Sequence, residues 1–463
     1  MLVLQNITIR RQTRTLIEGA TCTIYAGQRV GVIGKNGVGK STLFSAIRGE
    51  LLPDVGRIDL SKNVVVANVS QDTPALDQPA LDYALDGDVE LRALEARLRD
   101  LEQRIELHAT EADVNALVEA HDRLTTIDGY GARARAAQLL HGLGFVPDQQ
   151  EKPVASFSGG WRMRVALAAV LFSEPDLLLL DEPTNYLDLE GTLWLENYVS
   201  RYPHTVLLIS HDRDLLNRAV TSIVHLDQKK LTFWRGGYDQ FERQRAEQIE
   251  LQEKARVKQD AQRKHLKSFV DRFRAKASKA RQAQSRIKAL EKMKPIAAWS
   301  DETVRPFSFP EPVKSVASPI VAIQNGAVGY EPGKPILKNL TLRIDEDDRI
   351  ALLGANGNGK STFAKLIASR LQLDTGGITI APQLKVAMFA QHQLDDLRPD
   401  ENAIEHVRRL MPDAPESKVR ARVAQMGLAT EKMTTAAKDL SGGEKARLLM
   451  GLASFEGPNL FIL

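Results

Sequence analysis

Gly34-Lys35-Asn36-Gly37-Val38-Gly39-Lys40-Ser41 is the stretch that decides the fold of this chain. It follows an apolar run at residues 30–33 and precedes Thr42-Leu43-Phe44, so the sequence predicts a strand, a glycine loop and a helix in succession. The glycines of such a loop let backbone N–H groups turn inward around a phosphate, while the lysine and the serine hydroxyl suit phosphate oxygens and Mg²⁺. We therefore predict a phosphate-binding loop made by Gly34, Asn36, Gly37, Gly39, Lys40, Ser41 and Thr42.

The same loop occurs a second time after another apolar run, at residues 350–353, and this run is again expected to form a strand. The second loop contributes Gly354, Asn356, Gly357, Gly359, Lys360, Ser361 and Thr362. Its offset of 320 residues also carries Gln71 onto Gln391. Two further segments match each other at the smaller offset of 283: Ser158-Gly159-Gly160 and Ser441-Gly442-Gly443. The chain is therefore a tandem repeat, and its first copy holds 37 additional residues between the glutamine and the Ser-Gly-Gly.

Composition places the chain among ordinary globular proteins, because 43% of its 463 residues are hydrophobic and 26% are charged. This length allows two to four domains. A single cysteine, Cys22, excludes an internal disulfide framework and suits a reducing compartment. No stretch approaches the apolar length of a membrane span and no signal-like segment opens the chain, so we expect a cytoplasmic protein with no membrane partner.

The additional residues of the first copy predict a helical hairpin at residues 87–128. Two heptad-like series carry this prediction: Leu91, Leu94, Leu98, Leu101 and Ile105, then Val114, Leu117, His121, Leu124 and Ile127. Residues 88–128 hold five bases and eleven acids, a net charge of −6, so phosphate would repel this arm. We expect either a basic protein partner or a solvated hairpin without a partner.

Two apolar runs end in polar side chains that suit catalysis. Four leucines at residues 177–180 lead to Asp181 and Glu182, and a run at residues 206–209 leads to His211. Such runs are typical of buried parallel strands, whose carboxyl ends meet at the ligand-binding edge of an open α/β sheet.

Residues 237–312 are expected to form a linker of charged helix and proline-rich chain. Residues 261–294 hold twelve bases against two acids, a net charge of +10, so the rest of the chain is net acidic at −7. We place a turn between two helices at about residues 271–279, each helix extending roughly 30–40 Å. Charge concentrated in this way would attract an anionic polymer, unless it is only a solvated helical face.

In chain order, the glycine loop, the glutamine, Ser-Gly-Gly, Asp-Glu-Pro-Thr-Asn-Tyr-Leu-Asp at 181–188 and Ser-His-Asp at 210–212 resemble an ATP-binding cassette. Tandem cassettes with a basic helical linker, an arm in the first cassette and no membrane span resemble the ABC-F family. The short arm and Lys276-Ala277-Ser278-Lys279-Ala280 are most similar to its bacterial YheS branch. The resemblance implies an α/β fold with a first cassette at 1–236, a helical linker at 237–312 and a second cassette at 313–463.

The resemblance implies ATP and Mg²⁺ as cofactors, and ATP hydrolysis as the reaction. Glu182, His211 and Gln71 would be catalytic, and the metal ligands would be Ser41, Gln71 and Asp181 in one site and Ser361 and Gln391 in the other. Each ATP would lie between the loop of one cassette and the Ser-Gly-Gly of the other, pairing Lys40 with Ser441, Gly442 and Gly443, and Lys360 with Ser158, Gly159 and Gly160. Tyr330 lies 24 residues before the second loop, where an adenine-stacking aromatic is expected; the same spacing in the first cassette gives Arg10.

The end of the chain leads to a further expectation. Ser158 and Asp181 are 23 residues apart, and the same interval from Ser441 reaches one position past Leu463. The second cassette is thus expected to lack its C-terminal part and to bind ATP weakly or not at all, either as a fragment of a longer protein or as a degenerate copy.

By resemblance, the expected partner is the ribosome. A monomer with paired cassettes would enter the tRNA exit site, and its linker would approach the peptidyl-tRNA and the large-subunit RNA. The expected RNA contacts are Arg272, Arg274, Lys276, Lys279 and Arg281. Two alternatives stay open: an ATPase associated with DNA through the same basic hairpin, and the ATPase subunit of a transporter whose membrane spans lie on another chain.

Overall fold

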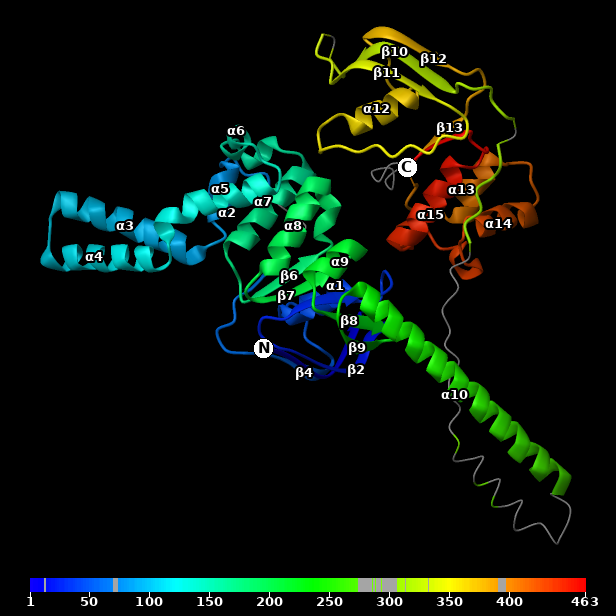
Figure 1. The fold of residues 1–463 in the computed structure, drawn as a ribbon, viewed down its shortest axis with the longest axis horizontal. Coiled ribbons are helices and arrows are strands. Elements are labelled where there is room, and N and C mark those ends of the chain that lie inside the picture. The colour runs from blue at the N-terminus through cyan, green and yellow to red at the C-terminus, as the bar shows by residue number, and fades with distance from the viewer. Residues whose placement is uncertain are drawn as a thin grey trace. The chain divides into compact units, whose positions relative to one another are not determined.

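The computed structural model describes residues 1–11, 14–69, 74–273, 285, 288, 293, 306–312, 314–331, 333–389 and 397–463. The chain divides into two compact units, Met1–Asp301 and Glu302–Leu463 (Figure 1). Each unit has its own sheets and helices, which confirms the predicted α/β class.

A six-stranded sheet forms the centre of the first unit, in the order β5-β6-β7-β3-β8-β9. The strands are β3 (Arg29–Ile33), β5 (Val66–Asn68), β6 (Leu177–Asp181), β7 (Thr205–Ile209), β8 (Ser222–Asp227) and β9 (Lys230–Arg235). All neighbours pair in parallel except β8 and β9, which form an antiparallel hairpin. Every residue of β7 is buried, as expected for a central parallel strand covered on both faces.

A smaller antiparallel sheet, ordered β2-β1-β4, packs with the central sheet around α1. Its strands are β1 (Leu2–Arg11), β2 (Arg14–Ile24) and β4 (Val55–Leu60), and α1 spans Lys40–Ile47. Phe44 of α1 is 2% exposed and shares one apolar core with Ile7 and Ile17 of the small sheet and Val32 of β3. This core holds the helix that begins at the glycine loop.

Helices cover the remaining apolar surface of the first unit. They are α2 (Ala80–Leu85), α5 (Ala132–Gly142), α6 (Pro147–Gln150), α7 (Gly159–Phe172), α8 (Leu189–Arg201) and α9 (Arg213–Ala219), with short 3₁₀ turns η1 (Gly129–Gly131), η2 (Val154–Ser156) and η3 (Pro183–Tyr186). Among them α7 is buried over most of its length, including Val165, Ala168 and Leu171. It packs against α2 and α5 and shares one apolar core with strands β6 and β7.

The additional residues form the predicted helical hairpin, with α3 at Val89–Leu107 and α4 at Glu111–Thr126. The four predicted leucines of α3, Leu91, Leu94, Leu98 and Leu101, are buried as expected. Val114 of α4 is 44% exposed, so its predicted inward position is wrong. The inward face of α4 starts one residue earlier, at Asp113, which pairs with Arg104 of α3. Thr110 caps α4 by accepting from the Asp113 N–H at 3.1 Å, and this cap defines where the helix begins.

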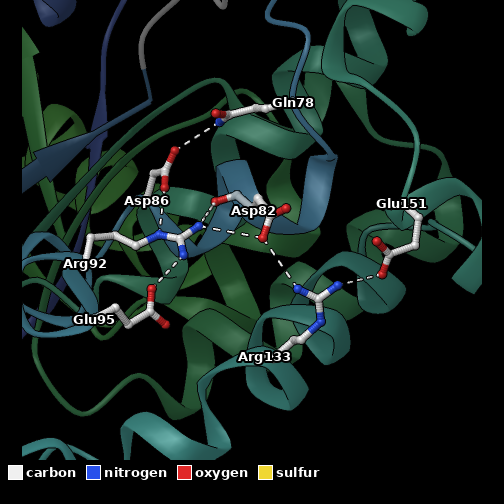
Figure 2. A network of polar contacts seen from close by, with 7 residues as sticks. All are labelled: Gln78, Asp82, Asp86, Arg92, Glu95, Arg133 and Glu151. Carbon is white, nitrogen blue, oxygen red and sulfur yellow. Dashed lines mark hydrogen bonds and ion pairs between the residues drawn. The ribbon is translucent and has the colours of Figure 1, made fainter. Parts of the chain in front are cut away.

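Polar contacts fix the root of this arm to the helices beneath it. Figure 2 shows the seven residues involved: Gln78, Asp82, Asp86, Arg92, Glu95, Arg133 and Glu151. Arg92 of α3 donates to Asp86 Oδ1, Glu95 Oε2 and the Asp82 carbonyl oxygen, each at 2.8 Å. Arg133 of α5 lies between Asp82 and Glu151, at 3.4 and 2.9 Å. The arm is therefore attached to α2 and, through Asp82, to α5.

A single long helix, α10 (Tyr238–Phe273), follows β9 and extends away from the sheets of the first unit (Figure 1). Its 36 residues correspond to about 54 Å at 1.5 Å per residue, so the predicted length of 30–40 Å was too short and the helix continues past residue 271. Arg272 lies in this helix, whereas Arg274, Lys276, Lys279 and Arg281 lie outside the described residues.

The second unit repeats the small sheet of the first, in the order β11-β10-β12, and again pairs two parallel strands, β13 and β14. Its strands are β10 (Val321–Val328), β11 (Leu337–Ile344), β12 (Thr375–Ile380), β13 (Val386–Met388) and β14 (Leu460–Ile462). Its helices are α12 (Lys360–Ile367), α13 (Ala403–Leu410), α14 (Glu416–Gln425) and α15 (Gly442–Ala453), with 3₁₀ turns η6 (Thr430–Lys432) and η7 (Ala437–Asp439).

The apolar run before the second glycine loop does not form the predicted strand. Residues 350–353 have no strand assignment, and Ile350 and Leu353 are 60% and 79% exposed. In the first unit the corresponding β3 pairs with β7 and β8. No described strand of the second unit pairs with residues 350–353, and a strand needs a neighbour to satisfy its backbone N–H and C=O groups.

Candidate nucleotide-binding site

The loop between β3 and α1 has a backbone that only glycine adopts without strain. Gly34, Gly37 and Gly39 have φ values of 157°, 72° and 115°. A Cβ at Gly34 would also lie 2.5 Å from the Leu226 carbonyl oxygen, and one at Gly39 would lie 3.0 Å from the Leu16 side chain. These close approaches hold the loop against the core, with α1 beginning at Lys40.

Lys40 lies folded into the concave side of this loop. Its Nζ donates to the Gly34 carbonyl oxygen at 2.7 Å and to that of Lys35 at 3.4 Å, and the residue is 8% exposed. Burial lowers the pKa of the ammonium, while the negative charges of Glu182 and Asp181 oppose this shift. A cation held in this way among backbone groups can bind phosphate oxygens with little reorganisation.

The two carboxylates lie where the sequence predicts, at the carboxyl end of β6. Glu182 has a φ of 48° and donates its N–H to the Ile209 carbonyl oxygen of β7 at 2.8 Å. Its Oε2 accepts from the His211 N–H at 3.3 Å, and its Oε1 lies 3.3 Å from His211 Nε2. The same Nε2 lies 2.9 Å from Asn36 Oδ1 in the glycine loop. The structure thus brings Glu182, His211 and the loop together.

Glu182 has the electrostatic setting of a general base. Burial raises the pKa of its carboxyl group, and the positive charges of His211 and Lys40 partly oppose this. Its Oε1 is buried without a hydrogen bond of normal geometry. A buried carboxylate oxygen with unused acceptor capacity fits a water or a hydrated cation beside it.

A cavity of about 610 Å³ adjoins these carboxylates. Ser41, Asp181 and Glu182 line it together with residues of α7 and of the segment that follows β6. Among the described residues, no group of three or more His, Cys, Asp or Glu side chains could hold a metal. Ser41 and Asp181 nevertheless fit Mg²⁺, which in nucleotide sites takes few protein ligands and completes its shell with phosphate and water. Gln71 and Gln391 lie outside the described residues.

The two Ser-Gly-Gly segments each begin a helix, but their serines differ. Ser158 precedes α7 and its side chain makes no capping hydrogen bond. Ser441 precedes α15 in a capping box: its Oγ accepts from the Glu444 N–H, and Glu444 Oε2 accepts from the Ser441 N–H at 2.8 Å. A tryptophan, Trp161, stands where the second copy has Glu444, so only the second serine is held this way. A Cβ at any of the four glycines, Gly159, Gly160, Gly442 and Gly443, would meet nothing within 4 Å.

Sequence reasoning missed Arg164, which connects α7 to the segment after the carboxylates. It is 1% exposed, donates to the carbonyl oxygens of Tyr186 at 2.8 Å and Leu143 at 2.9 Å, and lies 3.3 Å from Asp188 Oδ2. The repeat could have revealed this residue, because an arginine lies six positions after the serine of each Ser-Gly-Gly segment. The second of these, Arg447, donates to the Gly427 carbonyl oxygen at 3.2 Å.

The second glycine loop repeats the lysine geometry in a more exposed setting. Lys360 Nζ donates to the carbonyl oxygens of Gly354 at 2.6 Å and Ala355 at 3.0 Å, while Ser361 is exposed and Thr362 is 3% exposed. Tyr330 is 54% exposed and its OH accepts from Lys365 Nζ at 3.2 Å. Hydrogen bonds with Thr362 and Lys365 lower the pKa of Tyr330. In the first unit Arg10 is exposed, and its N–H donates to Asp54 Oδ2 at 2.8 Å.

A phosphate-binding loop, two carboxylates at the end of the adjoining sheet and a helix preceded by Ser-Gly-Gly define an ATP-binding cassette. The family model described as "ABC transporter" matches residues 17–185 and 337–463, and an extension model with the same description matches residues 224–309. No described helix is long and apolar enough to cross a membrane.

Three relatives resemble the chain over nearly its whole length. "Probable ATP-binding protein YheS" of Escherichia coli is 45% identical, over 100% of this chain and 71% of its own length. "ABC transporter F family member 3" of Arabidopsis thaliana is 37% identical, over 99% of this chain and 66% of its own length. "ATP-binding cassette sub-family F member 3" of Homo sapiens is 36% identical, over 99% and 64%. The chain belongs to the ABC-F family and is an ATP-binding protein with tandem cassettes, as the motifs predicted.

Proposed function

We propose that the first cassette hydrolyses ATP to ADP and phosphate in the presence of Mg²⁺. Lys40 and the N–H groups of the glycine loop bind the phosphates, and Ser41 and Asp181 hold the metal ion. Mg²⁺ supplies charge neutralisation on the phosphate oxygens when bound. Glu182 orients the attacking water and accepts its proton, and His211 lies beside the terminal phosphate. Gln71 is proposed as a further catalytic and metal-sensing residue.

One observation carries this proposal: the half-buried Glu182 carboxylate accepts a hydrogen bond from the His211 N–H and interacts with the positive charge of Lys40. Phosphoryl transfer is catalysed chiefly by positioning and by charge stabilisation, and these three side chains supply both. In the second cassette, Lys360, Ser361, Thr362 and Tyr330 are proposed as the ATP contacts, with Gln391 near the metal, and this site is proposed to bind ATP more weakly than the first.

That the Ser-Gly-Gly of each cassette completes the site of the other stays a prediction. Gly442→Asp would place a carboxylate beside the phosphates expected on Lys40, so hydrolysis should fall while the fold is retained.

We further propose that this protein acts on the ribosome in the cytoplasm, as a monomer, and modulates translation. Helix α10 supports this: it carries the chain away from the cassette in one unbroken element, and the segment of net charge +10 begins within it. Lysines and arginines near RNA phosphates bind by releasing counterions. We propose Arg272, Arg274, Lys276, Lys279 and Arg281 as contacts with large-subunit RNA or tRNA.

Co-sedimentation of the Glu182→Gln protein with ribosomes, with and without ATP, tests this proposal. ATP should increase the fraction that pellets with the large subunit, and changing the five proposed contacts to glutamine should abolish that increase. The matched control changes five exposed bases of the first cassette to glutamine: Arg11, Arg14, Lys62, Lys229 and Lys230. The two variants lose the same charge, so equal losses of binding, or no pelleting with ATP bound, would reject the proposed RNA contacts. Binding to duplex DNA in preference to ribosomal RNA would favour the DNA-associated alternative.

A further inference from the structure

Helix α9 begins directly after His211 of the nucleotide site. Asp212 caps the helix: its Oδ1 accepts from the N–H groups of Asp214 at 2.9 Å and Leu215 at 3.1 Å. His211 itself is tied to Glu182 through its backbone N–H. Because the cap is the residue next to His211, a displacement of the His211 backbone must also move the first turn of α9.

The other end of this connection is the start of α10, which rests on α9. Asn217 Oδ1 accepts from the Asp239 N–H at 2.9 Å and so satisfies one of the free donors of the first turn of α10. A Cβ at Gly237 would lie 3.1 Å from Asn217 Oδ1 and 3.2 Å from its Cα, so the two chains are in close contact. Arg213 lies 5.0 Å from the centre of the Tyr238 ring and 3.4 Å from Glu242 Oε1.

An apolar anchor lies one turn further along α10. Phe241 is 2% exposed, and its ring contacts those of His225 of β8 at 5.1 Å and Trp234 of β9 at 5.6 Å. With this anchor as a pivot, small movements of α9 are enlarged along the helix. Over a length of about 54 Å, a tilt of about 5° at the root displaces the far end by about 5 Å.

We propose that α9 transmits the state of the nucleotide site to α10, and that Arg213 and Asn217 are the positioning residues of this coupling. The proposal rests on the proposed function, because it explains how ATP would redirect the basic segment at the end of α10. The Arg213 side chain is 65% exposed, so its ion pair alone is weak. The two contacts act together, and both must be removed to uncouple the helices.

Pulsed electron paramagnetic resonance on the full chain tests the coupling. Two exposed lysines of the first unit are changed to cysteine and spin-labelled: Lys229 between β8 and β9, and Lys258 on α10. The single native cysteine, Cys22, is buried and is changed to alanine. Adding Mg²⁺ and the non-hydrolysable analogue AMP-PNP should shift the label distance by about 2 Å, because Lys258 lies about 26 Å along α10 from Phe241 and the tilt is about 5°. The Arg213→Gln/Asn217→Ala variant should bind AMP-PNP but lose most of the shift.

Three further variants test whether the shift depends on the contact between α9 and α10. Arg213→Lys keeps a cation beside Tyr238 and Glu242 and should retain the shift, and Arg243→Gln, at an exposed base of α10, should also retain it. Gly237→Ala leaves both positioning side chains in place but adds a Cβ that presses on Asn217, so it changes the spacing of α9 and α10 and should reduce the shift. An unchanged shift in the double variant and in Gly237→Ala, or no shift in the unmodified protein with AMP-PNP bound, would overturn the coupling.

The measurement contains no ribosome, so it separates the two proposals. A shift that depends on Arg213 and Asn217, combined with failure of ribosome co-sedimentation, would remove the proposed partner and leave the coupling intact.

Discussion

His211 and Glu182 are joined at two points: the His211 N–H donates to Glu182 Oε2, and His211 Nε2 lies 3.3 Å from Glu182 Oε1. They follow neighbouring parallel strands, β7 and β6, whose ends are themselves tied by the Glu182 N–H to the Ile209 carbonyl oxygen. Each side chain therefore orients the other, and both depend on the pairing of two central strands.

Glu182→Gln should abolish ATP hydrolysis while ATP binding is retained. Glutamine keeps the shape of the side chain but cannot accept a proton, so the rate should fall by about 10²-fold or more. Phosphate release measures hydrolysis, and equilibrium binding of a fluorescent ATP analogue measures affinity. Lys40→Met, by contrast, should lose ATP binding itself, and hydrolysis with it. Substantial turnover by the glutamine variant would assign the general base elsewhere.

The pH dependence should carry the signature of Glu182. Because burial raises the pKa of its carboxyl group, the proton-accepting form is reached only above the ordinary value of 4.5, and the acid limb of the rate profile should shift upward accordingly. The native state then holds this proton when the unfolded chain has lost it. This contribution to stability therefore falls as pH rises from 4.5 through the raised pKa. Urea unfolding across that range, with Glu182→Gln as the control that lacks the effect, measures it.

Arg164→Ala should destabilise the first unit by about 3–5 kcal/mol, since it removes the cation beside the buried Asp188 carboxylate. It also releases the carbonyl oxygens of Tyr186 and Leu143. The midpoint of urea unfolding is the measurement. Arg201→Ala, at the exposed end of α8, is the control and should change stability by less than about 0.5 kcal/mol. Equal effects of both changes would contradict the role given to Arg164.

Arg92→Gln should loosen the root of the arm. Its guanidinium holds two carboxylates and a carbonyl oxygen, and losing charge-assisted hydrogen bonds of this kind costs about 1.5–3 kcal/mol. Amide hydrogen exchange in α3 should become faster in the variant than in the unmodified protein, while exchange in α7 should stay the same. Arg97→Gln on the same helix is the matched control, because Arg97 is 52% exposed and lies 3.7 Å from Glu119, a pair worth under about 1 kcal/mol.

The local patterns of the sequence predicted the repeat, the glycine loops, the arm hairpin and the strand that delivers Asp181 and Glu182. Each of these depends on a short-range rule: glycine at positive φ, leucines at helical spacing, or an apolar run ending in acids. For this reason the loop lysines, Lys40 and Lys360, have the same carbonyl partners in both units.

What depends on distant neighbours was decided only by the tertiary structure. Residues 350–353 have the composition of a strand but lack a described partner strand, and Val114 is exposed because the buried face of α4 is made by Asp113, Ala120 and Leu124. Arg164 became a central contact because Leu143, Tyr186 and Asp188 surround it in space, which helical spacing alone does not reveal. The contact of α9 with α10 likewise joins Asn217 to Asp239 across 22 residues. Sequence periodicity reports which face of an element is apolar; the partners of its polar groups are set by packing.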